Sequence, residues 1–419
     1  MRILTISNLY PPERFGGWEL GCKQMVDELR RRGHDVRVLT STPRVFEDGA
    51  VNGDVVRLMR LEESWDPALI GTDTPLRRSR RVLVEPHNIE ILHQQLDTFE
   101  PDVVYVWNLL GLGALALLLA LRMRRLPWVV HLMDAMPLNL ASVAFGAHVR
   151  FADMLFPVLE GTWISCSQSL LDENAAANAV LRGNVVTVSN WISGPRPAMR
   201  THWYEPGSTL RCAYSGQIFT PKGIGIMLES VGTLVAEGLP IEVDLYGDGL
   251  ERFQYESMAL QLGLSDVVRF HGQVGQDALM SALAAHDVFL FPTEMREPFG
   301  FAPLEAAAAG CVPLVTGGAG VTEWLVSGVH LLTVRRDAAH LTDALRRIID
   351  GTLPLEPVGR RGQRVVLDDF HIEVVADKVE ALLQAEAERP RDAAEMSWRD
   401  IGRWARLTEL LADSLLAGD

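Results

Sequence analysis

The chain has 419 residues, enough for two domains of ordinary size, and 48% of them are hydrophobic, so each half can bury its own core. Acidic residues outnumber basic ones by 54 to 39, and the formal net charge of -15 argues against nucleic acid as a main partner. The four cysteines form no C-x-x-C pair, which argues against a zinc site or a disulfide framework and favours buried thiols in a reducing setting.

The first half of the chain alternates between predicted strands and helices. A strand at 2–8, a loop rich in Pro and Gly, a helix at 18–32 and a strand at 35–40 are typical of the opening of a Rossmann-like unit. Gly16 and Gly17 lie in that loop, where a plain turn is the alternative to a ligand-binding role. Further strands are predicted at 55–61, 103–107, 128–132, 162–165 and 185–189, and helices at 88–99 and 109–121.

Two polar residues, His131 and Asp134, mark the end of the buried strand at 128–132. Parallel α/β sheets bind their ligands at the carboxyl ends of the strands, so this position favours a functional role. A histidine satisfied locally in the core is the alternative. The apolar segment that follows, up to residue 160, is compatible with helices but is not assigned to any element.

The second half of the chain repeats the alternation and predicts a doubly wound parallel sheet. Its strands are predicted at 211–214, 241–246, 267–271, 288–291, 311–316 and 330–334, and its helices from 224 to 235, at 338–349 and at 372–385. We expect an N-terminal domain at 1–195, a linker at 196–207, a C-terminal domain at 208–370, and helices at 371–419 that cross back to the first domain. Apolar residues at helical spacing in 396–416 predict one more amphipathic helix, packed on the body or contacting a dimer partner or a membrane.

Two carboxylates, Glu297 and Glu305, stand eight positions apart around a segment of small and apolar residues. On one helix they would share a face; with Glu297 in a preceding loop, the helix N-terminus between them would offer backbone N–H groups to an anion. The stretch EPFGFAPLEAAAAGCVPLVT closely resembles the nucleotide-sugar segment of retaining glycosyltransferases of family 4, which have the GT-B fold. The resemblance extends over nearly the whole chain to about residue 385, and it is most specific from 216 to 334.

This resemblance implies an α/β protein with two Rossmann-like, doubly wound domains that face each other across a cleft. It implies a retaining transfer of a sugar from a nucleotide-diphosphate sugar, with Glu297, His131 and Lys222 as the catalytic residues. The donor-binding residues that it implies are Gly16, Gly17, Gln217, Lys222, Gln273, Val274, Gly300, Phe301, Ala302, Leu304 and Glu305. The family usually has an arginine where this chain has Gln217, which can donate hydrogen bonds but carries no charge.

The residue types fit these roles. Lys222, next to Gly223 at a predicted loop-to-helix junction, can meet the charge that grows on a departing diphosphate, although a surface lysine is the alternative. Glu305 can accept hydrogen bonds from both hydroxyls of a ribose. No Asp-x-Asp pair occurs in the chain, so we expect no metal site and no cofactor.

Two other functions are compatible with the same pattern. One is a sugar-nucleotide 2-epimerase of the same architecture, and the other is a non-catalytic nucleotide-sugar-binding subunit. The acceptor is left open among a glycan, a lipid-linked sugar and a small molecule, and the sugar, the nucleobase and the oligomeric state are open as well. We expect a cytoplasmic protein; the arginine clusters at 77–81 and 122–125 indicate a solvated face or contact with an anionic acceptor or the inner face of the membrane.

Overall fold

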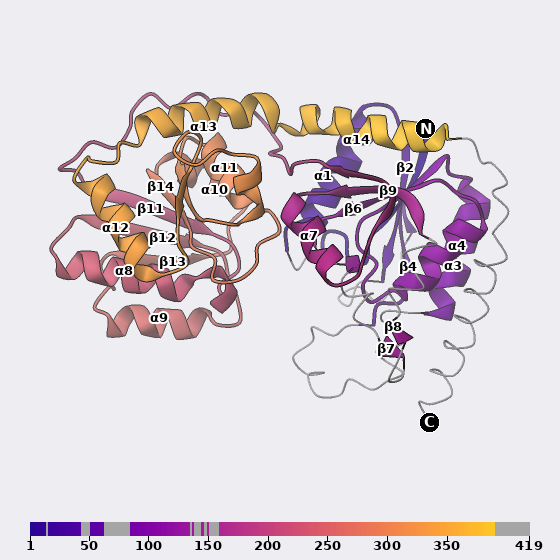
Figure 1. Cartoon of the computed structure of the whole chain (residues 1–419), viewed down its shortest axis with the longest axis horizontal. Helices are drawn as coiled ribbons and strands as arrows, with labels where there is room; N and C mark the ends of the chain where they lie inside the picture. Colours follow the sequence, from indigo (N-terminus) through magenta and orange to yellow (C-terminus); the bar gives the residue numbers. More distant parts are fainter. Residues whose placement is uncertain are drawn as a thin grey trace. The chain divides into compact units, whose positions relative to one another are not determined.

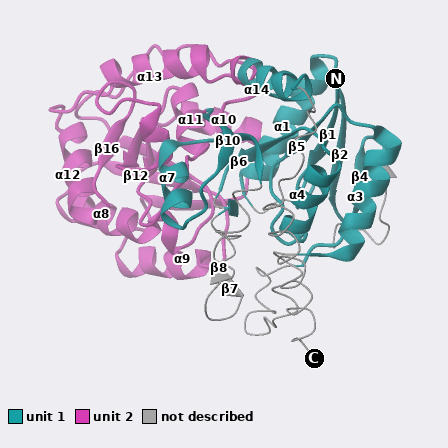
Figure 2. Ribbon diagram, turned by 45° about the vertical axis from the view of Figure 1, so that its right-hand side comes forward, with its two compact units in different colours: residues 1–188, 376–419 teal, residues 189–375 magenta. Residues whose placement is uncertain are grey.

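The computed structural model describes residues 1–13, 16–42, 51–62, 84–134, 136–137, 144–145, 149–150 and 159–389. The chain divides into two compact units, shown in different colours in Figure 2. Unit 1 comprises Met1–Val188 and Ala376–Asp419, and unit 2 comprises Ser189–Val375. The arginine cluster predicted at 77–81 and the amphipathic segment 396–416 lie outside the described residues.

Unit 1 is built on an eight-stranded sheet with the order β10-β9-β6-β5-β1-β2-β4-β3, in which every pairing except β3 with β4 is parallel. Figure 1 shows this sheet in the part of the chain coloured indigo to magenta. The strands are β1 (Arg2–Ile6), β2 (Asp35–Ser41), β3 (Val51–Asn52), β4 (Val55–Met59), β5 (Val103–Val106), β6 (Trp128–Leu132), β9 (Glu160–Ser165) and β10 (Arg182–Thr187). Its helices are α1 (Trp18–Arg31), α3 (Pro86–Phe99), α4 (Ala114–Met123) and α7 (Gln168–Ala176), and a short hairpin is formed by β7 (Ala144–Phe145) and β8 (Val149–Arg150). The central strands β5 and β6 are buried throughout, as continuous apolar runs of parallel sheets are.

Helix α4 begins five residues later than predicted. The sequence pattern placed its start at residue 109, but Gly111 and Gly113 have positive φ angles of 87° and 76°, which no right-handed helix accommodates. Gly113 caps the helix, and a Cβ atom there would lie 2.3 Å from the backbone nitrogen of Glu85. The two glycines therefore form a tight turn, which packs against the segment at Glu85, and the helix starts after them.

The last described helix, α14 (Ile372–Ala387), begins in unit 2 and continues into unit 1. Within unit 1, Arg32 at the end of α1 contacts Asp377 at 2.6 Å and Glu380 at 2.7 Å. The hydroxyl of Thr162 on β9 donates a buried hydrogen bond of 2.7 Å to Glu386. These contacts attach α14 to α1 and to β9 within unit 1.

Unit 2 contains a six-stranded, fully parallel sheet with the order β13-β12-β11-β14-β15-β16. The strands are β11 (Leu210–Ser215), β12 (Ile241–Tyr246), β13 (Val268–Gly272), β14 (Val288–Phe291), β15 (Val312–Thr316) and β16 (Leu332–Val334). The helices are α8 (Ile224–Ala236), α9 (Arg252–Gln261), α10 (Gln276–Ala284), α11 (Ala302–Ala308), α12 (Ala338–Ile349) and α13 (Glu356–Asp369), with single 3-10 turns η3 (Thr220–Lys222) and η4 (Gly320–Glu323). Three of these helices, α9, α10 and α13, are not among the predicted elements.

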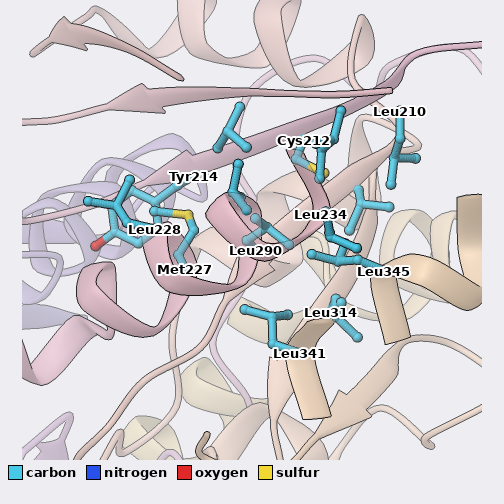
Figure 3. Packing of buried hydrophobic residues seen from close by; sticks show 14 of the residues in the cluster. Leu210, Cys212, Tyr214, Met227, Leu228, Leu234, Leu290, Leu314, Leu341 and Leu345 are labelled. Carbon is cyan, nitrogen blue, oxygen red and sulfur yellow. The ribbon is translucent and has the colours of Figure 1, made fainter. Parts of the chain in front are cut away.

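The core of unit 2 lies between this sheet and the helices α8 and α12. Figure 3 shows Leu210, Cys212 and Tyr214 of β11 among the leucines of α8, β14, β15 and α12. All four cysteines of the chain are buried and free. The segment predicted as a linker, 196–207, lies inside unit 2, where Arg200 forms an ion pair of 2.7 Å with Asp287. Within the described residues, no helix is both long and apolar enough to cross a membrane.

Candidate active site

The carboxyl edge of the unit 2 sheet carries most of the predicted site residues. The strand order reverses direction between β11 and β14, and open α/β sheets bind ligands at such a switch point. The loop after β11 contains Gln217 and Lys222, and the loop after β14 contains Glu297. The two loops are joined by a hydrogen bond of 3.1 Å from the backbone nitrogen of Glu294 to the carbonyl of Pro221.

Lys222 and Glu297 meet at this switch point. The Lys222 Nζ atom lies 2.6 Å from Glu297 Oε2, and the two side chains are only 26% and 11% exposed. The backbone enforces the approach, since Gly223 has a φ angle of 77° and a Cβ atom there would lie 1.8 Å from the carbonyl oxygen of Pro292. An ammonium group and a carboxylate are thereby held together in a partly buried position.

Glu305 lies in the first turn of α11, whereas Glu297 lies in the loop before that helix. The first of the two geometries considered for this motif, with both carboxylates on one helix face, is therefore wrong. The helix is only seven residues long because Gly310, with a φ angle of 80°, ends it just before β15. Burial raises the pKa of the Glu305 carboxyl above its usual range, with a hydrogen bond from Gln276 acting in the opposite direction.

The predicted base-binding residues, Gln273 and Val274, follow directly after β13. The next helix begins at Gln276, and its side-chain amide nitrogen donates a hydrogen bond of 2.8 Å to Glu305 Oε1. This bond ties the corner after β13 to the start of α11. Gln276 was not predicted, and neither was the helix that it begins.

The segment between the two glutamates forms the turn into α11. Gly300 has a φ angle of 97°, and a Cβ atom there would lie 3.0 Å from the Phe291 ring. Phe301 caps the helix, Ala302 is its first residue, and Leu304 is fully buried beneath it. The N–H groups of a first helical turn have no acceptor within the helix, so this turn can present donors to an anion or a hydroxyl.

Gln217 lies in the loop after β11, next to Gly216, whose φ angle is 148°. The hydroxyl of Tyr214 donates a hydrogen bond of 2.7 Å to the Gln217 carbonyl and fixes the backbone there. The Gln217 side chain is half-buried. The structure therefore places it on the same edge of the sheet as Lys222, five residues earlier in the chain.

The predicted catalytic histidine, His131, belongs to unit 1 and lies on β6. Its ring is fully buried, its Nδ1 atom lies 2.6 Å from the hydroxyl of Tyr105, and the ring of Trp107 packs 4.7 Å away, centroid to centroid. Burial lowers the pKa of His131 to about 3, so the imidazole is neutral at pH 7. Tyr105 was not predicted as a site residue, because a buried tyrosine in an apolar strand is indistinguishable from core packing by sequence alone.

A pocket lies at the corresponding edge of the unit 1 sheet. Its lining residues come from the start of α1 and from the segments that follow β5 and β6; they are Trp18, Trp107, Asn108, Met133, Asp134 and Met136. The strand order of unit 1 reverses between β5 and β1, so this pocket also lies at a switch point. His131 is not a lining residue, but its neighbour Trp107 is.

Gly16 and Gly17 lead into α1 near this pocket. Gly17 caps the helix, and the Gly16 nitrogen donates a hydrogen bond of 3.0 Å to the buried carboxylate of Glu19. Their predicted role toward a donor phosphate concerns a ligand and stays a prediction. Among the described residues, no three His, Cys, Asp or Glu side chains are grouped so that they could hold a metal ion.

The comparisons with known proteins agree with this arrangement. Residues 197–365 match the model of "Glycosyl transferases group 1", and residues 16–171 match that of "Glycosyl transferase 4-like domain". Together the two matches span most of both units. The chain belongs to the glycosyl transferases. This transferase is similar to the glycogen synthase of Mycobacterium tuberculosis strain H37Rv, with 23% identity over 415 residues that cover 90% of the chain and 92% of the relative.

Solved structures show the fold of this glycosyl transferase. Sucrose-phosphate synthase from Thermosynechococcus elongatus superimposes with a TM-score of 0.69 at 18% identity, covering 91% of this chain and 98% of that one. The Anabaena protein HepE, solved in complex with UDP-glucose, gives a TM-score of 0.65 at 16% identity, covering 92% and 100%. The predicted fold class, GT-B with two parallel-sheet α/β domains, is confirmed.

Proposed function

We propose that this glycosyl transferase moves a sugar from a nucleotide-diphosphate sugar to an acceptor hydroxyl, with retention of anomeric configuration and without a metal ion. The observation that carries the proposal is the Lys222–Glu297 pair at the switch point of unit 2, with Glu305 eight positions further on. A cation, a sugar-binding carboxylate and a ribose-binding carboxylate are the groups that this chemistry needs on the donor side.

Lys222 stabilises the negative charge of the departing diphosphate. An ammonium group has three N–H donors, so Lys222 can keep its bond to Glu297 and still donate to a phosphate oxygen. Negative charge grows on the diphosphate as the glycosidic bond breaks, and a preorganised cation stabilises that charge more in the transition state than in the ground state. Lys222 therefore replaces the divalent ion that other glycosyltransferases bind through Asp-x-Asp.

The two glutamates bind the hydroxyl groups of the donor's ribose and of its sugar. Glu305 accepts hydrogen bonds from the vicinal hydroxyls of the ribose, for which its carboxylate geometry is suited. Glu297 accepts from hydroxyls of the transferred sugar, assisted by the N–H groups of Gly300, Phe301 and Ala302 at the start of α11. Gln273 and Val274 contact the base, and Leu304 packs under the turn.

The transfer follows a front-face course, as the resemblance to family 4 implies. The bond between the anomeric carbon and the phosphate oxygen breaks, and the acceptor oxygen forms the new bond on the same face. The acceptor's proton passes to the departing phosphate oxygen, so the products are the glycoside and the protonated nucleoside diphosphate. His131 donates a hydrogen bond to the sugar; because its ring is fully buried, this contact requires a neighbouring side chain to move.

The names of similar proteins support a nucleotide sugar as the donor, since HepE is described with UDP and UDP-glucose and the M. tuberculosis relative is a glycogen synthase. The acceptor is a glycan, a lipid-linked sugar or a small molecule. A thermal-shift panel of UDP-, ADP-, GDP- and dTDP-sugars identifies the donor, because a ligand bound to the native state raises the apparent stability. Glu305→Ala serves as the control and is expected to lose the shift.

Two further measurements test the chemistry. Incubation with the donor alone should give no 2-epimer; formation of one would replace the transferase by the epimerase alternative. With an acceptor present, turnover should survive a chelator, and the NMR coupling of the anomeric proton should be that of the donor. Complete loss of turnover with the chelator, restored by magnesium or manganese, would contradict the metal-independent mechanism.

A further inference from the structure

Two polar side chains, Tyr105 and His131, face each other inside unit 1. Tyr105 on β5 and His131 on β6 are both 0% exposed, and the hydroxyl oxygen lies 2.6 Å from His131 Nδ1. In the register of the two strands Tyr105 pairs with Val129, so Tyr105 and His131 extend from the same face of the sheet as diagonal neighbours. The contact is therefore built into the strand pairing.

The direction of this hydrogen bond follows from the donors and acceptors around it. A phenol has a single proton to donate, and a buried donor without an acceptor is strongly disfavoured. Trp107 packs edge-on against Tyr105 with centroids 5.5 Å apart, but an indole has only a donor. Among the described residues, His131 Nδ1 is the acceptor that the structure gives to Tyr105. Nδ1 must then carry no proton.

We propose that Tyr105 is a positioning residue that holds neutral His131 in the tautomer with its proton on Nε2. The tautomer of a histidine is set by the hydrogen bond that the other ring nitrogen makes, and here that bond comes from Tyr105. The result is an imidazole that can only donate at Nε2, which suits a hydroxyl oxygen of the sugar. This inference rests on the proposed catalytic role of His131.

The pKa values are consistent with a neutral pair. Burial lowers the pKa of His131 to about 3 and raises the pKa of the Tyr105 hydroxyl well above its usual range, so neither group is charged at pH 7. Trp107 connects this pair to the pocket, because its ring contacts His131 and also lines the pocket. A donor fixed at Nε2 lies one residue from the end of β6, close to the segment that forms that pocket.

Nitrogen NMR of the ¹⁵N-histidine-labelled protein tests the tautomer directly and needs no substrate. We expect His131 to show a protonated Nε2 and an unprotonated Nδ1 from pH 6 to 8. Tyr105→Phe, which preserves the shape of the core, should shift the resonances toward a mixture of tautomers. A Nδ1-protonated His131 in the wild type, or an unchanged spectrum in Tyr105→Phe, would overturn the inference while leaving the proposed transferase reaction intact.

Kinetics separate a positioning role from a structural one. Tyr105→Phe should lower turnover about 2- to 12-fold, the effect of one neutral hydrogen bond, and leave UDP or GDP affinity and Tm nearly unchanged. Tyr204→Phe, which removes a weak hydroxyl contact in unit 2, is the matched control and should turn over normally.

Rescue by the amide variants tests the same assignment. His131→Gln carries an N–H donor near the Nε2 position and should retain part of the turnover, whereas His131→Asn, whose amide mimics Nδ1, should not. Equal turnover in both amide variants would contradict a functional Nε2 donor. Wild-type turnover in both would show that His131 itself has no catalytic role, and the proposal for Tyr105 would fall with it.

Discussion

The two units have similar parallel sheets but differ in what they place at the switch point. In unit 2 the edge between β11 and β14 carries charged groups, with Lys222 and Glu297 at 2.6 Å and Glu305 nearby. In unit 1 the edge between β1 and β5 carries a pocket of indole and thioether side chains with Asp134 and Asn108, and one of its lining residues, Trp107, packs on the neutral His131. The same fold therefore supports one edge with a paired cation and another edge lined mostly by aromatic and thioether groups.

This difference matches the two halves of the proposed reaction. A nucleotide diphosphate carries negative charge that grows during the reaction, so its site needs a fixed cation and the means to hold that cation in a partly buried position. A sugar or aglycone presents hydroxyl groups and apolar faces, for which neutral donors and aromatic rings are suited. Substitutions in unit 2 should therefore change how well the charge of the diphosphate is stabilised. Substitutions in unit 1 should change how the sugar or aglycone is oriented.

The largest effect is expected for Lys222→Ala. Removal of one donor aimed at a developing negative charge typically costs about 10²–10³ in rate. The affinity for the nucleoside diphosphate should fall less than turnover, and part of that fall comes from Glu297, whose carboxylate is left without its cation. Single-turnover kinetics and calorimetric titration with the diphosphate measure the two quantities separately.

Two controls sharpen this test. Adding Glu297→Gln to Lys222→Ala should recover part of the affinity but not the turnover, since the repulsive charge is gone while the cation is still absent. Lys23→Ala removes an ion-paired lysine on α1 and should behave as the wild type. If Lys222→Ala keeps most of its turnover, another cation neutralises the phosphate and the assignment of Lys222 is wrong.

The second effect concerns Glu305. Glu305→Ala should weaken nucleotide binding by about 1.5–3 kcal/mol, the range for hydrogen bonds to a charged group. Since burial raises the pKa of this carboxyl, wild-type affinity should fall as the pH is lowered through that raised pKa, starting above the 4.5 of an ordinary glutamate. Titration calorimetry at several pH values measures both effects, with the ion-paired Glu242→Ala as control. Unchanged affinity in Glu305→Ala would remove this residue from the ribose site.

Much of the fold was predictable because apolar runs and glycine-rich turns recur at regular intervals in the chain. Except for the two-residue β3, the strands of both sheets were predicted to within a few residues, and the alternation with helices predicted the parallel sheets. The sequence pattern missed a helix where its glycines are needed for close packing against other segments. Helix α13 contains Gly359 and Gly362, which argue against a helix, but a Cβ atom at these positions would lie 2.0 Å from Trp203 and 2.2 Å from the His330 carbonyl.

The candidate site was predictable as a set of residues but not as a set of contacts. Lys222 and Glu297 were each singled out, but they are 75 positions apart and meet only because β11 and β14 are neighbours in the sheet. Gln276 and Tyr105 were missed for the same reason, since their partners Glu305 and His131 lie on other elements. Such pairings depend on strand order, which the sequence pattern of one chain does not specify.

The third effect concerns unit 1. His131→Ala should lower turnover about 10-fold, the upper range for one neutral hydrogen bond, and leave nucleotide affinity unchanged because Lys222 and Glu305, which are proposed to bind the diphosphate and the ribose, lie in unit 2. Steady-state kinetics together with titration of the nucleoside diphosphate measure the two quantities. Reduced nucleotide affinity with normal turnover would reverse the contrast between the two units.

The smallest effect is expected for Gln217→Arg, which adds the charge that the family usually has at this position. The half-buried side chain lies on the same edge of the sheet as Lys222, so a guanidinium there can pair bidentately with phosphate oxygens. We expect the nucleoside diphosphate to bind about tenfold more tightly, or about 1.4 kcal/mol, with a steeper dependence on salt. Gln254→Arg makes the same change of charge on the exposed face of α9 and should leave affinity unchanged.

Because the added cation stabilises the bound product as well as the transition state, product release should slow, and turnover should rise less than affinity. Equal affinity in the wild type and Gln217→Arg would show that the side chain at 217 points away from the diphosphate, and Lys222 would then bind it without help from this loop position.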